Sequence, residues 1–597
     1  MTLLSDSPAS VSSDPAGVAT RWLGEFERAS SAGDRVALEA LFTSDATWRD
    51  QVSFSWSITN WEGDARVAEA FIAADRKATG FRLKTGTQPT LADLGAGDRV
   101  TAIFDFRNVY GVGSGVVQLA PAENGIGWAA EHLMTQLDEL ADHGWQVDER
   151  RPIGRGHGGI IDRPDPAETW AEAIAFENRE PEVVVLGAGH NGLMIGARLE
   201  RLGVDTLIID RNERVGDVWR KRYPALALHN ITEVNDFPFF PFPRSFPRYL
   251  PKEQLADFME YYAKAMELKV WGDSGIEKAT YDEKSKRWTV TVRRGDGSTR
   301  DLHPAHLVLA TGLNGNPRIP EFPGQEEFSG TVAHSGDFTG GREWKGKKVV
   351  VVGAGVSAHD IAQDLYEHGA DITLVQRSST YIVNVDTFHK YFYADYLVPG
   401  VSTEIADITS SMIPLGVLRR RGGLKFATDL MADDDKQLLD DLKARGFAFD
   451  FRDNGNGVAE GHHSGRDSYY FDIGASRLIA DGEITFTSGH GVERFTENGV
   501  VLDDGTELEA DHVVLATGYT SMLDAVRPII GDEVADRIGT VWRWGDDDEI
   551  SNVWHKTAQP GLWFMTGTIR DSRIGSKALA LQIKAIQEGL DSFPEAG

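Results

Sequence analysis

The sequence predicts an α/β protein in which two parallel-sheet domains follow a smaller α+β domain. Two segments that begin near residues 182 and 348 share one pattern: an apolar strand, a glycine-rich turn, an amphipathic helix and a second apolar strand. Residues 18–145 instead show helical spacing first and alternating strand-like runs later. At 597 residues the chain is also too long for a single hydrophobic core.

The bulk composition excludes several classes of function. Acidic residues exceed lysine and arginine by 30, so the surface repels the phosphate backbone of nucleic acids. The sequence contains no cysteine, which excludes disulfides, thiolate metal sites and thiol nucleophiles. No apolar run reaches the ~18 residues that span a bilayer, and residues 1–17 lack the pattern of a secretion signal. We therefore expect a cytoplasmic protein without nucleic-acid, membrane or metal partners.

Composition and periodicity divide the chain into six segments. The first residues are small and polar and predict a disordered tail, whereas glycine, proline and charge around 154–168 predict a linker. Two strands that end in LATG, at Gly312 and Gly518, predict the points where the chain crosses between the parallel-sheet domains. The expected segments are a disordered tail (1–15), an α+β domain (16–150), a linker (151–178), the first part of one dinucleotide-binding domain (179–312), a second such domain (313–515) and the returning part of the first (516–597).

The second dinucleotide-binding domain contains an insertion at about residues 381–468. Its apolar pattern is less periodic than that of the flanking segments, and its DNGNG run around Asn454 predicts loops. No task for this insertion follows from the sequence.

The first glycine motif predicts a binding site for a dinucleotide. Gly187, Gly189 and Gly192 follow a strand directly and open a helix. The first glycine permits the tight turn, the second lets a pyrophosphate approach the backbone, and the third lets the helix pack on the strand. The helix N-terminus then favours the phosphate charge, and Asp210 is placed to accept hydrogen bonds from ribose hydroxyls. The alternative is a turn whose glycines serve packing only.

The second glycine motif predicts another nucleotide site with a different preference. Its spacing is Gly353, Gly355 and then Ala358, which the pattern tolerates because alanine is still small. The next strand ends in Gln376 and Arg377, where an NAD site would present an acid. Arg377 could pair with a ribose 2′-phosphate. NADPH is therefore favoured with NADH as an alternative, and the competing interpretation of Arg377 is a solvated surface charge.

The absence of cysteine also decides between two kinds of protein that carry two such domains. Flavin disulfide reductases need a redox-active cysteine pair, which this chain lacks. What remains is a flavin that is reduced by NADPH and passes its electrons to oxygen or to another acceptor.

Further motifs give the chain a family resemblance. FSGTVAHSGDF at 328–338 contains Gly330 and His334, and LATGY ends at Tyr519. YYFDIGASRLIADGEI and GSKALALQIKAI follow near the end of the chain. With the two glycine motifs, this set resembles the flavin-containing monooxygenases, class B flavoprotein monooxygenases, from about residue 181 to 589. The GDVWR segment departs from the family's GGxW, so Asp217 is expected to alter contacts near the FAD adenosine.

The resemblance implies a fold and a reaction. It implies two Rossmann-like domains, for FAD and NADPH, after an N-terminal unit that resembles a SnoaL or ketosteroid-isomerase-type cone. That combination is similar to the type II branch of the family. In the family, NADPH reduces FAD, and O2 adds at flavin carbon 4a to give a peroxide or hydroperoxide. This species oxygenates a small organic substrate, either a ketone by Baeyer-Villiger chemistry or a soft nitrogen or sulfur atom.

The resemblance also implies roles for individual residues. Asn230, in LHNITE, matches an active-site asparagine near flavin and nicotinamide, where an amide can hydrogen-bond a reactive oxygen without protonating it. The simpler alternatives are that Asn230 only forms a turn, that Trp219 belongs to the core, and that Ser357 and Asp360 are ordinary first-turn residues of a helix. His334 is expected to serve the linker rather than catalysis. The further residues implied at the cofactors are Trp219 and Arg220 along FAD, Ser357 and Asp360 at NADPH, His229 and Ile231 beside Asn230, and Val218.

Two alternatives to oxygenation remain open. An NAD(P)H oxidase or an electron-transfer flavoprotein reductase would carry the same glycine motifs. The other alternative is that the N-terminal unit is a separate isomerase or dehydratase that uses Arg49, Asp50 and His132, although no acid-base pair is identifiable from their spacing. We expect this unit to cover the cofactor cleft or to make a subunit contact, as in a homodimer. The natural substrate does not follow from the sequence.

Overall fold

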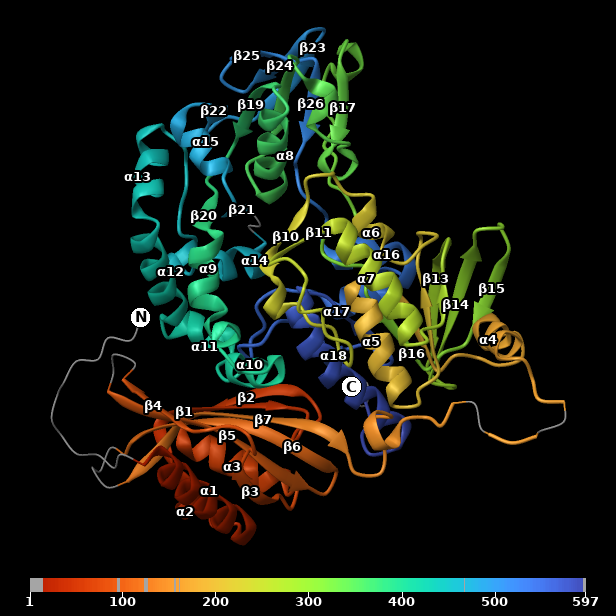
Figure 1. Ribbon diagram of the computed structural model, residues 1–597, viewed down its shortest axis with the longest axis vertical. Helices are drawn as coiled ribbons and strands as arrows, with labels where there is room; N and C mark the ends of the chain where they lie inside the picture. Colours follow the sequence, from red (N-terminus) through yellow and green to blue (C-terminus); the bar gives the residue numbers. More distant parts are fainter. Residues whose placement is uncertain are drawn as a thin grey trace.

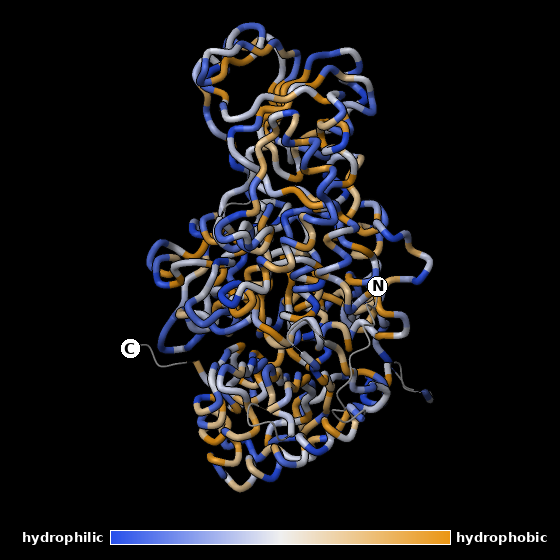
Figure 2. Tube along the Cα trace, turned by 90° about the vertical axis from the view of Figure 1, so that its left-hand side faces the viewer, coloured by the Kyte–Doolittle hydropathy of each residue, from blue (hydrophilic) through white to orange (hydrophobic). Residues whose placement is uncertain are grey.

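The computed structural model describes residues 14–93, 97–122, 127–154, 157–159, 162–465 and 468–593. Three parts follow one another along the long axis of the molecule (Figure 1): the N-terminal domain, a first Rossmann-like domain in the middle and a second one at the far end. Apolar segments run through the interior of each part (Figure 2). The expected disordered tail, residues 1–15, lies outside the described residues except for Asp14 and Pro15, where the first helix begins.

The N-terminal domain is a seven-stranded sheet with helices packed on its inner face. The strand order is β2-β1-β7-β6-β5-β3, with β4 paired to β5, and only β1 and β7 run parallel. Its elements are α1 (Pro15–Ala32), α2 (Arg35–Glu39), β1 (Phe42–Gln51), β2 (Ile58–Glu62), α3 (Asp64–Ala74), β3 (Thr79–Leu83), β4 (Thr90–Asp93), β5 (Asp98–Asn108), β6 (Gly111–Pro121) and β7 (Trp128–Leu140).

Aromatic side chains fill the space between this sheet and its helices. Trp48 of β1 stacks on Phe71 of α3 with 3.6 Å between ring centroids, and Phe26 of α1 meets Phe71 edge-on at 4.9 Å. α1 starts where the Asp14 carboxylate accepts a hydrogen bond from a first-turn N–H. The inner face of the sheet is therefore a packed core, and the opposite face is free to contact the rest of the chain.

The first Rossmann-like domain is a five-stranded parallel sheet of order β12-β9-β8-β16-β27. The strands are short, apolar and buried because helices pack on one face and a three-stranded antiparallel sheet packs on the other. Its sheet and main helices are β8 (Val183–Leu186), α5 (His190–Arg201), β9 (Thr206–Ile209), α7 (Lys252–Ala265), β12 (Val270–Trp271), β16 (His306–Leu309), β27 (Leu562–Phe564) and α18 (Ile569–Gln587). Its smaller elements are α6 (Asp217–Arg220), β10 (Ala227–Ile231), β11 (Tyr249–Pro251), β13 (Ser274–Asp282), β14 (Arg287–Arg294), β15 (Thr299–Leu302), α16 (Met522–Ile530) and α17 (Asp532–Ile538).

The second Rossmann-like domain is inserted between β16 and β27. Its parallel sheet has the order β17-β26-β18-β19-β22, so the chain leaves the first sheet after Leu309 and returns to it at Leu562. Its elements are β17 (Thr331–His334), β18 (Lys348–Val352), α8 (Val356–Glu367), β19 (Asp371–Gln376), α15 (Ala475–Asp481), β22 (Thr485–Ser488), β23 (Val492–Thr496), β24 (Gly499–Leu502), β25 (Glu507–Glu509) and β26 (His512–Leu515).

The insertion at 381–468 is mostly helical. The DNGNG run, for which the sequence predicts loops, contains a short 3-10 turn at Asp453–Gly455, in which Asn454 has a positive φ of 57°. The remaining helices are short, six to twelve residues, so their apolar periodicity is weak. The elements are β20 (Tyr381–Asn384), α9 (Val385–Phe392), α10 (Thr403–Ser410), α11 (Leu415–Arg420), α12 (Gly423–Asp434), α13 (Lys436–Ala444) and α14 (Gly457–Ser464), followed by β21 (Tyr469–Asp472), which pairs with β20.

The outer face of the N-terminal sheet packs on this insertion. Ile103, Val116 and Met134 of the sheet form one buried cluster with Ile408 and Met412, in and after α10. Figure 1 shows α10 directly over this sheet, and Arg420 and Arg421, at the end of α11, pair with Glu62 of β2. The expected linker at 151–178 contains one helix, α4 (Pro166–Ala175).

Among the described residues, no helix combines the length and the apolar character needed to span a membrane.

Candidate active site

A cavity of about 1270 Å³ lies between the two Rossmann-like domains and the insertion. Pockets for drug-sized ligands usually measure roughly 300–1,000 Å³, so this cavity has room for more than one small molecule. Its wall combines the first glycine turn, β10, the start of α8, the start of α18, the insertion helices and Arg49 of the N-terminal domain.

The first glycine turn forms a cradle that fits a dinucleotide. A Cβ on Gly192 would lie 1.8 Å from the Gly187 carbonyl oxygen, and Gly187 itself has a φ of 109°. Nothing lies within 4 Å of a Cβ position on Gly189, which faces the cavity and begins α5 without a side-chain cap. Asp210 accepts from the backbone N–H of Ala188 at 2.6 Å and lines the cavity. The exposed N–H groups of α5 and this carboxylate match a pyrophosphate and a ribose.

The second glycine turn has the same construction. Gly353 has a φ of 127°, and a Cβ there would lie 2.4 Å from the Ala516 carbonyl oxygen. Gly355 begins α8 without a side-chain cap, and Ser357 in the first turn lines the cavity. Arg377 is exposed and makes no hydrogen bond or ion pair with the described residues. This turn therefore also fits a nucleotide, with a free guanidinium at the end of the next strand.

Asp360 is engaged elsewhere. Its carboxylate accepts from the Tyr223 hydroxyl at 2.7 Å and lies 3.4 Å from His229 Nε2. Tyr223 and His229 belong to the first domain, whereas Asp360 belongs to α8 of the second. Asp360 therefore links the two domains, and it does not belong to the cavity lining.

The residues of α6 divide between the cavity and the surface. Val218 and Trp219 line the cavity, and Trp219 also packs on the core of its domain. Arg220 lies outside the lining and donates to Asp217, Asp257 and Glu260. Asp217, the departure from the family motif, thus stabilises the short helix through Arg220.

Strand β10 presents two of its three predicted residues to the cavity. His229 and Asn230 line it, whereas Ile231 is fully buried in the core beneath the insertion. The Asn230 backbone carbonyl accepts from Asn235 Nδ2 at 3.3 Å, but its side-chain amide has no hydrogen-bond partner in the described part of the chain. This amide is therefore available to a bound molecule.

Comparisons with known proteins agree with this geometry. A family model described as flavin-binding monooxygenase-like matches residues 180–421. Indole-3-pyruvate monooxygenase YUCCA1 of Oryza sativa subsp. japonica is 31% identical over 363 residues, which cover 60% of this chain and 82% of that protein. The chain belongs to the flavin-binding monooxygenase-like family. This membership confirms the sequence-based expectation of an FAD- and NADPH-dependent monooxygenase.

Further relatives of this flavin monooxygenase support the same assignment. Probable indole-3-pyruvate monooxygenase YUCCA3 of Arabidopsis thaliana is 32% identical over 57% of this chain and 73% of its own length. Among solved structures, an OTEMO complex with FAD and NADP has a TM-score of 0.51 at 17% identity, covering 69% of this chain and 86% of that one. A steroid monooxygenase bound to NADP has a TM-score of 0.50 at 19% identity, covering 70% and 88%. At such identities, the structural matches show the fold alone.

The sequence did not identify the part of the flavin monooxygenase cavity that the insertion supplies. Burial lowers the pKa of His462 to about 4 and that of His463 to about 3, so both imidazoles are neutral near pH 7. In the sequence, this wall of the cavity is indicated only by an enrichment of aromatic residues between Tyr381 and Phe471, which form no recognisable motif. The aromatic and histidine side chains of the insertion and β21 that line the cavity are Phe388, Tyr391, Phe392, Tyr393, His462, His463, Tyr469 and Phe471.

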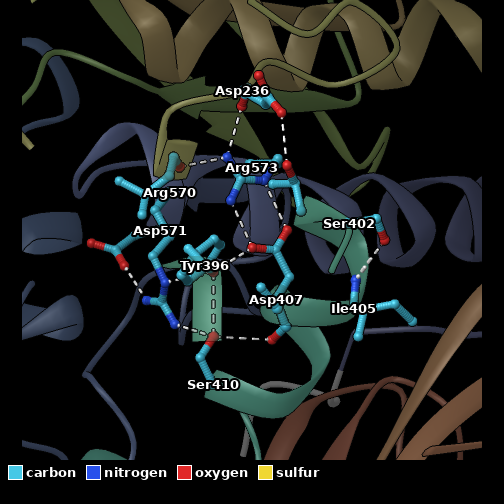
Figure 3. Close-up of polar contacts among 12 residues, drawn as sticks. Asp236, Tyr396, Ser402, Ile405, Asp407, Ser410, Arg570, Asp571 and Arg573 are labelled. Carbon is cyan, nitrogen blue, oxygen red and sulfur yellow. Dashed lines mark hydrogen bonds and ion pairs between the residues drawn. The ribbon is translucent and has the colours of Figure 1, made fainter. Parts of the chain in front are cut away.

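A buried polar network joins the insertion to α18 of the flavin monooxygenase. Arg573 donates to both oxygens of Asp407 of α10, at 2.6 and 2.8 Å, and to the carbonyls of Val234 and Asp236 (Figure 3). Arg570, which lines the cavity, donates to the Tyr396 hydroxyl at 2.8 Å. The network fixes the insertion against the first Rossmann-like domain. In sequence, the two arginines appear only as an i,i+3 pair ahead of the GSKALALQIKAI motif.

His334 has the structural role expected of it. Its Nδ1 accepts from the Gly336 N–H, and its Nε2 lies 3.1 Å from the Gly518 carbonyl oxygen. The ring therefore ties the end of β17 to the segment after β26, where the chain crosses between the domains.

The three N-terminal residues considered for a separate site have different surroundings. Asp50 accepts from Ser53, Ser55 and backbone N–H groups of its own turn, and His132 pairs with Thr47. Arg49 points to the other face of the sheet and pairs with Glu549. The structure therefore does not bring the three together, because Arg49 and Asp50 are adjacent on β1 and face opposite sides.

Proposed function

We propose that the chain uses NADPH and O2 to insert one oxygen atom into a small organic substrate held in the cavity. The substrate is a ketone, oxidised by Baeyer-Villiger chemistry, or a molecule with a soft nitrogen or sulfur atom. The observation that carries this proposal is one continuous cavity that joins the first glycine turn, the start of α8 and the aromatic wall of the insertion.

Each cofactor has a set of residues that fits it. FAD would lie along Gly187, Gly189 and Asp210, with Val218 and Trp219 beside it. NADPH would bind at the second glycine turn, with Gly353, Gly355 and Ser357 at the phosphates and Arg377 at the 2′-phosphate. When bound, FAD supplies the acceptance of electrons from NADPH and the activation of O2.

The chain's own residues supply orientation and exclusion of water. The Asn230 amide can donate to an oxygen atom and accept from a nicotinamide amide, and it carries no acidic proton. The neutral imidazoles of His462 and His463 likewise add no acidic proton to the aromatic wall. An aromatic wall of this kind helps to exclude water, and exclusion of water protects reactive species from hydrolysis and proton leakage.

We also propose that the N-terminal domain is SnoaL-like and that the chain falls in the type II branch of the family. A sheet whose helices α1 and α3 pack on one face is consistent with a cone. The matched family model begins at residue 180, so this domain lies outside it.

The reaction is tested with a panel of cyclic ketones, sulfides and amines. Product mass should increase by one oxygen, and peroxide release should account for only a minor part of the NADPH consumed. If NADPH is consumed but all of it appears as peroxide with every compound, the chain is an NAD(P)H oxidase. If electrons pass only to an added acceptor, it is an electron-transfer reductase.

Replacing Asn230 with leucine should uncouple the reaction and leave FAD bound. Loss of one hydrogen bond of roughly 0.5–1.5 kcal/mol would raise the fraction of NADPH lost as peroxide about two- to twelve-fold. Peroxide and NADPH are measured together in wild type and variant. The exposed turn residue Asn498, changed to leucine, serves as the control. Unchanged coupling in N230L would remove Asn230 from this role.

Replacing Arg377 with alanine should weaken the binding of NADPH more than the binding of NADH. Charge-assisted hydrogen bonds to a phosphate predict a rise of about ten-fold in the KM for NADPH, whereas the KM for NADH, which lacks this phosphate, should stay within about two-fold. Both constants come from the initial rate of cofactor oxidation. An equal rise for both cofactors would place the 2′-phosphate elsewhere.

A further inference from the structure

One residue of the N-terminal domain reaches the cavity of the flavoprotein domains. Arg49 lies on β1, and its side chain lines the cavity. Its Nε and Nη2 donate to the two carboxylate oxygens of Glu549, each at 2.7 Å, and its Nη1 donates to the Ser411 carbonyl oxygen at 2.8 Å. Only 14% of the Arg49 side chain and 7% of the Glu549 side chain are exposed. This is a buried, bidentate ion pair between two residues that are 500 positions apart in the chain.

A second residue of the same domain holds the same loop. Asn60 of β2 donates through Nδ2 to Glu549 at 3.0 Å and to the Asp547 carbonyl oxygen at 2.8 Å. Asp548, Glu549 and the adjacent Ile550 line the cavity. The N-terminal domain therefore fixes the backbone and the carboxylate of one cavity wall.

The third donor group of Arg49 fixes the adjacent wall, where the Gly416 N–H also donates to the Asp548 carbonyl oxygen at 3.2 Å. Ser411 directly follows α10, and Ile413, Leu415 and Leu418 after it line the cavity. The guanidinium thus connects the 547–550 loop to the insertion. An arginine suits this task because its planar fork can satisfy a carboxylate bidentately and still donate to a third group.

We propose that Arg49 is a positioning residue of the oxygenation site, through which the N-terminal domain holds two cavity walls together and keeps water out. This inference rests on the proposed function, because its consequence is the coupling of NADPH oxidation to oxygenation. Loss of Arg49 leaves the Glu549 carboxylate buried without its cationic partner, which draws in water or moves the loop.

The test compares four variants with a matched control. Arg49→Met removes the charge and keeps most of the length, Arg49→Lys keeps the charge without the fork, Glu549→Gln removes the carboxylate charge, and the fourth variant combines R49M with E549Q. The control is Arg421→Met. Arg421 also joins the insertion to the N-terminal domain, through Glu62 at 2.5 Å, but it does not line the cavity.

Each protein is measured as the FAD-loaded full chain with the best substrate of the panel. The readouts are KM, kcat, peroxide per NADPH, the rate of flavin reduction by NADPH under nitrogen, and the thermal unfolding midpoint. For R49M we expect kcat/KM to fall about ten- to a hundred-fold, since small misplacements of a site cost this much. The loss should lie mainly in KM and in a several-fold rise of peroxide, with flavin reduction unchanged.

The variants should distinguish a role of Arg49 in positioning the cavity walls from a general role in attaching the N-terminal domain to the insertion. R49K should recover only part of the coupling, and the double variant should be no worse than R49M, because the unpaired charge is then gone. R421M should keep the coupling of the wild type. Equal losses in R49M and R421M, or wild-type coupling in R49M, would overturn the inference. Failure of NADPH to reduce the flavin in the wild type would instead refute the proposed function, and the unfolding midpoints would still report on the ion pair.

Discussion

Changing Gly192 to alanine should abolish flavin binding. The added Cβ would lie 1.8 Å from the Gly187 carbonyl oxygen and 3.4 Å from Val185 Cγ1, so α5 must move away from β8. Overpacking of this kind costs about 1–3 kcal/mol and displaces the backbone. Because the N-terminus of α5 is the proposed site of the pyrophosphate, the displacement should remove the binding site itself. The ratio of visible flavin absorbance to protein in the purified variant measures the loss.

Gly189, in the same turn, provides the matched comparison. A Cβ there meets nothing within 4 Å, and its φ of −71° suits any residue. Gly189→Ala should therefore fold with unchanged circular dichroism and lose FAD affinity only because the methyl group obstructs the pyrophosphate. Full flavin content in both variants would contradict the proposed FAD site.

The second large effect is expected from Arg573→Met. Arg573 is 7% exposed and pairs with both oxygens of Asp407, which is 17% exposed. Removing one partner of a buried pair should lower the free energy of unfolding by about 3–5 kcal/mol, because Asp407 keeps an uncompensated charge. Urea denaturation followed by fluorescence measures this change.

Two control variants test whether the loss of stability in R573M comes from the buried ion pair. Arg527→Met breaks the pairs with Asp532 and Asp536 at the surface and should leave the unfolding midpoint unchanged. Asp407→Asn combined with Arg573→Met should recover part of the lost stability, since the buried charge is removed as well. A midpoint for R573M equal to that of the wild type would show that the network of Figure 3 does not hold the insertion in place.

The sequence predicted the parts of the site that depend on backbone geometry. The two glycine motifs specify their turns locally, because Gly187 and Gly353 have positive φ values that other residues rarely adopt. The family and the reaction class followed from these motifs and the absence of cysteine. The domain boundaries and the roles of individual site residues stay predictions.

Side-chain partners that come from distant segments could not be predicted in this way. Arg220 and Asp360 stand at positions that the resemblance assigns to cofactors, yet one pairs with surface acids and the other with Tyr223 of the opposite domain. Such contacts depend on how separate segments meet in space. The same holds for Arg49 and Glu549, whose pairing no local pattern encodes.

The order of the strands has a consequence for biosynthesis. β16 lies beside β27 in the first sheet, although β27 follows about 250 residues later in the chain. Ribosomes add roughly 5–20 residues per second, so one edge of β16 stays unpaired for on the order of 10–50 s while the second domain emerges. An open, apolar edge invites association with other nascent chains. Chaperone protection of this half-made sheet is therefore expected to govern the yield of intact protein in a recombinant host.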